Sequence, residues 1–110
     1  MYEPFIGEIM LFAGVFAPKG WMFCHGQILS TTENTALFSI LGTIYGGNGQ
    51  TTFALPDLRG RVPMGFGQSP GFANVTLGER GQLSTHGSSL MGALGLNYCI
   101  ATQGIYPSRS

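Results

Sequence analysis

Glycine and proline occur along the whole length of this chain, and this feature constrains its fold more than any other feature of the sequence. The 110 residues include eighteen glycines and six prolines, spread along the sequence rather than clustered. Glycine admits a positive φ and proline fixes φ, so both residues favour turns. Their spread favours many short strands and tight turns over a helical fold. Collagen is excluded, because no glycine period of three appears.

Charged side chains are scarce. Five basic and five acidic residues make up 9% of the chain and give zero formal net charge, against a usual charged share of about 25%. Such a chain lacks the positive surface that binding to nucleic acid or to an anionic membrane requires. Little repulsion opposes contact between molecules, which favours self-association. The length suits one domain, so we expect residues 1–110 to form a single unit.

No segment has the composition of a signal peptide or a membrane span. Residues 5–16 are apolar, but they include Glu8, lack a basic flank and end without a small-residue cleavage site. The uncharged residues 81–108 are rich in Gly, Ser, Thr and Gln, whereas a spanning helix needs about 18 or more consecutive apolar residues. We therefore expect neither feature.

Short β-rich runs predict four strands. They cover residues 8–13, 21–25, 52–55 and 96–102. The turn chemistry of residues 17–20, Ala-Pro-Lys-Gly, predicts a hairpin between the first two strands. His25, Gly26 and Gln27 are expected to form another tight turn, in which the histidine is a polar turn residue rather than a ligand.

One segment has the period of an amphipathic helix. Its apolar residues recur at i, i+1, i+3, i+4, i+7 and i+8 as Leu37, Phe38, Ile40, Leu41, Ile44 and Tyr45. Ser30 and Glu33 have the spacing of a capping box, Thr32 is an alternative N-cap, and two glycines at 46–47 end the pattern. We expect a helix at about 31–45 that covers the core, with a partner-binding face as the alternative. With long glycine-rich loops, this predicts a small α+β, mainly β domain.

The cysteines and histidines show no local metal-ligand spacing. Cys24 and His25 are adjacent, and both Cys99 and His86 are isolated, so no CxxC or HxxxH pair is present. We therefore predict no metal site. The cysteines allow at most one disulfide, and two buried reduced thiols are the favoured interpretation, because free cysteine packs as a small hydrophobe.

No arrangement of side chains indicates catalysis. None of the five carboxylates has a strand or helix spacing to another that would face one substrate. Cys24 and His25 are neighbours and would point to opposite faces of a strand. The glycine-rich residues 46–52 lack the lysine of a phosphate-binding loop. We expect no catalytic residues, no enzyme activity and no cofactor.

The densest polar feature is the group formed by Asp57, Arg59 and Arg61, which holds three of the ten charged side chains within five residues. On an extended segment these side chains would project from one face. One interpretation is structural: an arginine of the same segment or of a neighbouring subunit binds the carboxylate in bidentate fashion and fixes a turn or a subunit contact. The alternative is that the arginines grip an anionic or sugar-bearing ligand, which the nearby acid disfavours.

Four motifs together carry a resemblance to a known family. They are GxIxxFAG at 7–14, GWxxCxGQ at 20–27, LFxxLGxxYGG at 37–47 and FxLPDLRGR at 53–61. In this combination the chain resembles phage tail collar domain proteins, especially the bacterial branch called microcystin-dependent proteins. The likeness covers about residues 3–77 and 96–109.

The resemblance implies a non-enzymatic structural module of a virion tail or an extracellular tail-like particle. The best-known members are homotrimeric short tail fibres, so it implies self-association into a homotrimer, with an open fibre as the alternative. Further partners would be other tail proteins or a cell-surface glycan, and an adhesin module that binds a receptor or glycan is the alternative function. Trp21, Asp57, Arg59 and Arg61 lie in the motifs and are candidates for structural or subunit contacts.

The chain departs from the family at about residues 78–95. Many relatives carry a long insertion there, with a His-Thr-His-like motif that in some tail fibres holds a metal on the trimer axis. This chain has a contracted segment, Ser84-Thr85-His86, with one histidine, so metal binding is not carried over. We also expect no receptor-binding tip, which relatives carry as an insertion in this region, and this favours an assembly module over an adhesin.

Overall fold

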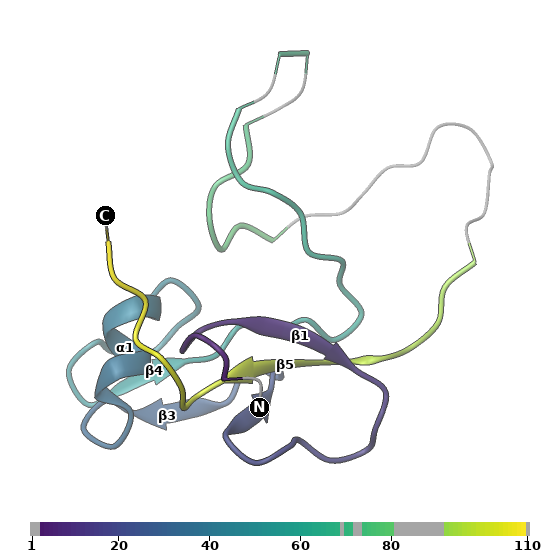
Figure 1. Cartoon of the computed structure of the whole chain (residues 1–110). Coiled ribbons are helices and arrows are strands. Elements are labelled where there is room, and N and C mark those ends of the chain that lie inside the picture. Colours follow the sequence, from purple (N-terminus) through teal and green to yellow (C-terminus); the bar gives the residue numbers. More distant parts are fainter. Residues whose placement is uncertain (1–2, 69, 72–73, 81–91, 110) are drawn as a thin grey trace.

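The computed structural model describes residues 3–68, 70–71, 74–80 and 92–109. These residues form five strands and one helix (Figure 1). In chain order the elements are β1 (Ile9–Phe12), β2 (Trp21–Phe23), β3 (Ile28–Ser30), α1 (Thr35–Leu41), β4 (Thr52–Ala54) and β5 (Asn97–Ala101). The predicted α+β, mainly β class is confirmed. The four predicted strands contain β1, β2, β4 and β5.

The first sheet has β5 at its centre, with β1 and β2 antiparallel on either side. The register pairs Ile9 with Ile100 and Trp21 with Ala101. The predicted hairpin between the first two strands is therefore wrong, because β5 lies between them. Cys99, Ile100 and Ala101 are each 0% exposed, and a central strand can pair its backbone groups along both edges, which suits so deeply buried a segment.

The second sheet consists of β3 and β4, which are antiparallel, with Leu29 opposite Phe53. The sequence does not predict β3. Residues 28–30 form only a short run, and a segment rich in helix-capping residues follows directly. The sequence therefore predicts the start of a helix there. The pairing of Ser30 with Thr52 fixes this segment as a strand end instead.

The helix is shorter than the predicted 31–45. It begins at Thr35 after the N-cap Asn34, because Ser30 belongs to β3 and the chain turns before helical geometry starts. It ends at Leu41, since Gly42 has a φ of 57° and donates its N–H to the carbonyl of Phe38, a conformation that glycine adopts readily. No helix among the described residues has the length and apolar character to cross a membrane.

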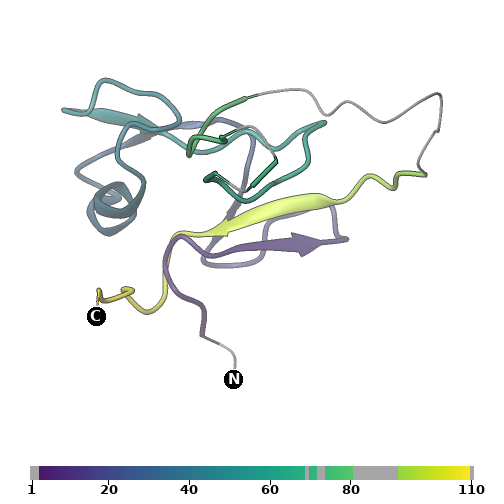
Figure 2. The ribbon, with the colours of Figure 1, turned by 90° about the horizontal axis from the view of Figure 1, so that it is seen from above.

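The core lies where the helix meets both sheets. Leu37 and Leu41 of α1 are buried with Phe53, Leu55 and Ile100. Figures 1 and 2 both show α1 at the end of the molecule that holds β3 and β4. The helix therefore covers the core, as predicted, and Leu37 and Leu41 of its apolar stripe pack there, whereas Ile44, beyond the end of the helix, is 45% exposed.

Both cysteines are buried free thiols. Burial, together with the smaller effect of the nearby Cys99, raises the pKa of Cys24 to about 12. Burial also raises the pKa of Cys99. Each thiol therefore stays protonated at neutral pH and packs as a small apolar group.

A long irregular segment leaves the two sheets after the LPDLRGR sequence (Figure 1). We call residues 61–68, 70–71 and 74–80 the arm. Gly67 and Val75 pair across it through two backbone hydrogen bonds of 2.6 and 2.9 Å. Apart from the half-buried Val75, the described arm residues are exposed. The Cα radius of gyration is 15.6 Å, above the roughly 13 Å of a compact domain of this length.

The predicted contraction at about 78–95 falls mainly on residues 81–91, which lie outside the described residues, as does His86. The contraction therefore stays a prediction. The assignment of residues 1–110 to a single domain does so as well.

Candidate functional site

The segment that carries the charged group is fixed to the body of the protein by its backbone. Leu55 donates its N–H to the carbonyl of Gln27 at 3.0 Å, and Leu58 donates to the carbonyl of Cys24 at 2.9 Å. Between them, Asp57 forms an antiparallel bridge with His25. The last packed residues before the arm are thus held against the turn that precedes β3.

Beyond Leu58 the chain turns instead of staying extended. Arg61 donates its N–H to the Leu58 carbonyl at 3.2 Å, and Gly60 has a φ of 64°. The expected extended segment is therefore wrong for these residues. Glycine at the third position of the turn permits the reversal.

The turn brings the three charged side chains together, and we call this group the Asp57 clasp. Arg59 donates from Nε to Oδ1 of Asp57 and from Nη2 to Oδ2, both at 2.9 Å, and its backbone N–H also donates to Oδ1 at 3.1 Å. Arg61 donates from Nη1 to the Asp57 carbonyl at 3.0 Å and lies 3.7 Å from Oδ2. The guanidinium fork comes from Arg59 of the same segment, which is one of the two sources that the sequence allows.

This pairing determines what the clasp can do. The hydrogen bonds from the Arg59 side chain hold the pKa of Asp57 far below its usual range, and the same contact raises the pKa of Arg59. Asp57 is 18% exposed and Arg59 is 61% exposed. A carboxylate already occupies the guanidinium fork, so the clasp is a poor site for an anionic ligand and a good one for fixing the base of the arm.

Substitution of Asp57 tests the clasp. Asp57→Ala should lower the melting temperature by a few degrees, and Asp57→Asn by less, because asparagine keeps an oxygen that can accept the Arg59 backbone N–H. Differential scanning calorimetry of both variants measures this. If both variants had the melting temperature of the wild type, the clasp would not stabilise the fold.

The pH dependence of the clasp follows from the lowered pKa of Asp57. Its folded value lies below the roughly 3.9 of an unfolded aspartate, so the stabilisation is present above about pH 4 and is lost as pH falls through the folded pKa. The difference in melting temperature between wild type and Asp57→Asn should therefore stay constant from about pH 5 to 8. A difference that shrinks already near pH 6 would contradict this assignment.

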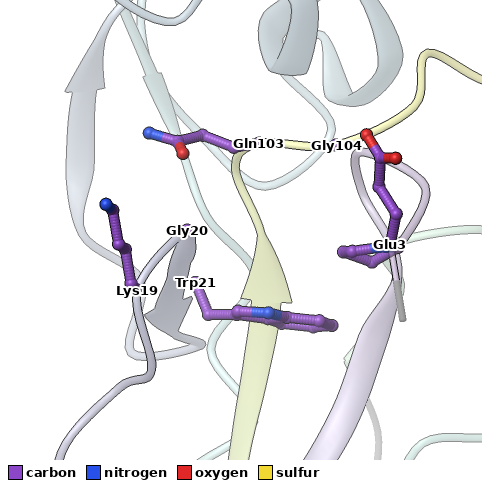
Figure 3. A pocket seen from close by; sticks show the side chains of 7 residues that line it. Glu3, Lys19, Gly20, Trp21, Gln103 and Gly104 are labelled. Carbon is purple, nitrogen blue, oxygen red and sulfur yellow. The ribbon is translucent and has the colours of Figure 1, made fainter. Parts of the chain in front are cut away.

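Trp21, the other candidate, lies in an open hollow with a volume of about 400 Å³ (Figure 3). Its lining comes from the chain start, the turn before β2 and the segment after β5, as Glu3, Pro4, Lys19, Gly20, Trp21, Gln103 and Gly104. The clasp residues are not part of the lining. The sequence alone predicts no link between Glu3, Lys19 and Gln103, because they lie far apart in the chain. The pairing of β2 with β5 and the bridge between Phe5 and Ile105 bring them together.

Among the residues that the structure describes, no group of three or more His, Cys, Asp or Glu side chains is placed to hold a metal ion. His25 stacks on Phe23 with ring centroids 5.0 Å apart. Its backbone N–H donates to the Gln27 side chain at 3.0 Å. His25 is thus part of the turn.

Comparison with known proteins gives two results. Residues 7–63 match the family model described as Phage Tail Collar Domain. The chain is also 35% identical over 78 residues to the short tail fiber protein gp12 of Enterobacteria phage T4. That alignment covers 70% of this chain and 15% of the relative, so the chain corresponds to a small part of that protein.

Proposed function

Since the chain belongs to the phage tail collar domain family, we propose that it is a non-enzymatic structural module of a virion tail or tail-like particle that assembles with copies of itself. The name of the T4 relative, a short tail fiber protein, supports the tail location and the structural role. A homotrimer is the first expectation and an open fibre the second. Other tail proteins are further partners in this proposal. Membership of the microcystin-dependent branch stays a prediction.

The observation that carries self-association is the exposed first part of the arm, which follows Arg61 and carries no charge. Val62, Met64 and Phe66 are 67%, 58% and 66% exposed. They occupy alternate positions, so an extended segment presents them on one face. No charged residue occurs from 62 to 78. Such an apolar stripe on a neutral segment is typical of a surface that another molecule covers.

The backbone of the arm supports the same proposal. Within the part of the chain that the structure describes, residues 62–66 make no hydrogen bond between backbone groups. The outer edge of β1 is also free of a neighbouring strand there, and Ile9 and Leu11 on this strand are 42% and 55% exposed. An edge with free donors, acceptors and apolar side chains readily accepts another extended segment.

The proposed contact therefore joins the arm of one copy to the β1 edge of the next. Because two different surfaces meet, the contact is heterologous, and its rotation decides between a closed ring and a filament. This explains why both a trimer and a fibre are compatible with the same interface. The Asp57 clasp, at the base of the arm, would fix the direction in which the arm leaves each copy.

Sedimentation velocity over a micromolar concentration series tests the proposal. We expect a species of three chains, or larger polymers whose size grows with concentration. Negative-stain electron microscopy then distinguishes compact particles from filaments. A stable monomer throughout the micromolar range would contradict self-association.

The adhesin alternative at Arg59 and Arg61 receives no support from the geometry. Arg59 is bound in bidentate fashion by Asp57, and Arg61 donates to the Asp57 carbonyl. Both arginines are thus engaged within their own segment, which leaves the structural function as the better supported one.

A further inference from the structure

The hollow around Trp21 combines an aromatic ring with several polar groups. Figure 3 shows the Lys19 side chain on one side of the indole, Glu3 on the other side and Gln103 across the opening. The hollow is open to solvent and its volume of about 400 Å³ falls within the roughly 300–1,000 Å³ of small-molecule sites. It therefore has room for one small ring-shaped ligand.

Within the described part of the chain, the polar side chains around this hollow have no hydrogen-bond or ion-pair partner. There the Glu3 carboxylate, the Lys19 ammonium and the Gln103 amide make no hydrogen bond or ion pair. The same holds for the indole N–H of Trp21. Two of the ten charged side chains of a charge-poor protein thus border one hollow without pairing to any residue that the structure describes.

The walls of the hollow are held by backbone contacts. Gly104 has a φ of 143°, and a Cβ at this position would collide with the carbonyl oxygen of Pro4. That oxygen accepts the N–H of Ile105 at 2.8 Å. The Gly20 carbonyl accepts the backbone N–H of Thr102 at 2.8 Å and its hydroxyl at 3.1 Å. The site is thus largely formed before any ligand enters, which lowers the entropic cost of binding.

We propose that this hollow binds a neutral saccharide unit. The C–H face of a pyranose ring can pack on the indole, whose ring face carries partial negative charge. Sugar hydroxyls both donate and accept, and the hollow offers an acceptor in Glu3, a donor in Lys19 and both in Gln103. The opposite charges of Glu3 and Lys19 give no net attraction for an anion, so a neutral sugar fits better than a phosphate.

Affinity for a single sugar should be weak. One monosaccharide has about a dozen heavy atoms, and at about −0.3 kcal/mol per atom the dissociation constant is on the order of millimolar. Repeated copies in an assembled fibre would raise the effective affinity for a polymer that carries many such units. Sugar binding is independent of the contact between copies, since the arm does not line the hollow.

Fluorescence gives a direct test, because Trp21 is the one tryptophan of the sequence. The wild type is titrated in parallel with the methyl glycosides of glucose, galactose and mannose and with N-acetylglucosamine. We expect a saturable change in Trp21 emission with half-saturation in the millimolar range for at least one sugar. Saturation-transfer NMR with the same sugars should show contact to the C–H face of the ring.

A matched pair of variants locates the site. Gln103→Ala should raise the half-saturating concentration about fivefold to tenfold, the usual effect of losing one hydrogen bond, whereas Gln50→Ala, another exposed glutamine away from the hollow, should not. Glu3→Gln is a second variant that keeps the shape of the side chain. Sedimentation of Gln103→Ala should match the wild type, which separates sugar binding from assembly.

Three results would overturn the proposal. One is a Trp21 emission that changes linearly with the concentration of every sugar, as expected for a bulk solvent effect. Another is an equal response of Gln103→Ala and Gln50→Ala. The last is saturable binding of inorganic phosphate in place of the sugars, since that would assign the hollow to an anion.

Discussion

Replacing Val62, Met64 and Phe66 together by serine is expected to convert the assembled protein into monomers without unfolding it. About two thirds of each of these side chains is exposed in the isolated chain, so burying the exposed part would stabilise each contact by roughly 3 to 6 kcal/mol in total. That corresponds to a change in affinity of roughly 10²- to 10⁴-fold. Sedimentation velocity measures the dissociation, and circular dichroism checks the fold.

The control for the arm is a second exposed apolar pair. Val15 and Phe16 are 90% and 66% exposed and lie in the loop after β1. Replacing both by serine removes a similar kind of surface but should leave assembly unchanged. Dissociation of this variant, with the arm variant still assembled, would move the interface to the loop and refute the assignment of the arm.

The strands of the fold were largely predictable, because each depends on local composition. The β-rich residues 96–102 contain β5, and residues 52–55 contain β4. The order of the strands was not predictable in the same way. The place of β5 between β1 and β2 depends on contacts between the two ends of the chain, and local turn rules carry no information about them.

The helix ends earlier than its apolar period predicts, because of one glycine. The apolar period continues to Tyr45, yet the helix ends at Leu41 because Gly42 adopts a positive φ. At the other end, Ser30 lies in β3, so the helix begins only at Thr35 even though the Ser30 hydroxyl accepts the Glu33 backbone N–H at 3.4 Å. Tertiary pairing and backbone freedom therefore decided the limits, while the apolar period correctly indicated which face packs on the core.

The two candidate sites also differ in how far the sequence could predict them. The pairing of Asp57 with Arg59 joins residues two positions apart, so the sequence could suggest it even though the expected extended geometry was wrong. The surroundings of Trp21 could not be suggested in this way. Gln103 comes near Gly20 only because β2 pairs with β5, and the bridge between Phe5 and Ile105 brings in the chain start.

The largest effect on stability is expected at Phe53. This side chain is 0% exposed, and its ring centroid lies 5.3 Å from that of Phe38 on α1. It thus connects the second sheet to the helix. Phe53→Ala should lower the free energy of unfolding by roughly 3 to 5 kcal/mol, a large part of the roughly 5 to 15 kcal/mol of an ordinary domain.

Phe16→Ala is the matched control for Phe53→Ala. Phe16 is 66% exposed and its main ring contact is an edge-on one with Phe12 at 5.9 Å, so the loss should stay near or below about 1 kcal/mol. Urea denaturation of both variants should be done in the arm variant with three serines, because assembly would otherwise add to the apparent stability. An equal loss in the free energy of unfolding for the two variants would contradict the placement of Phe53 at the centre of the core.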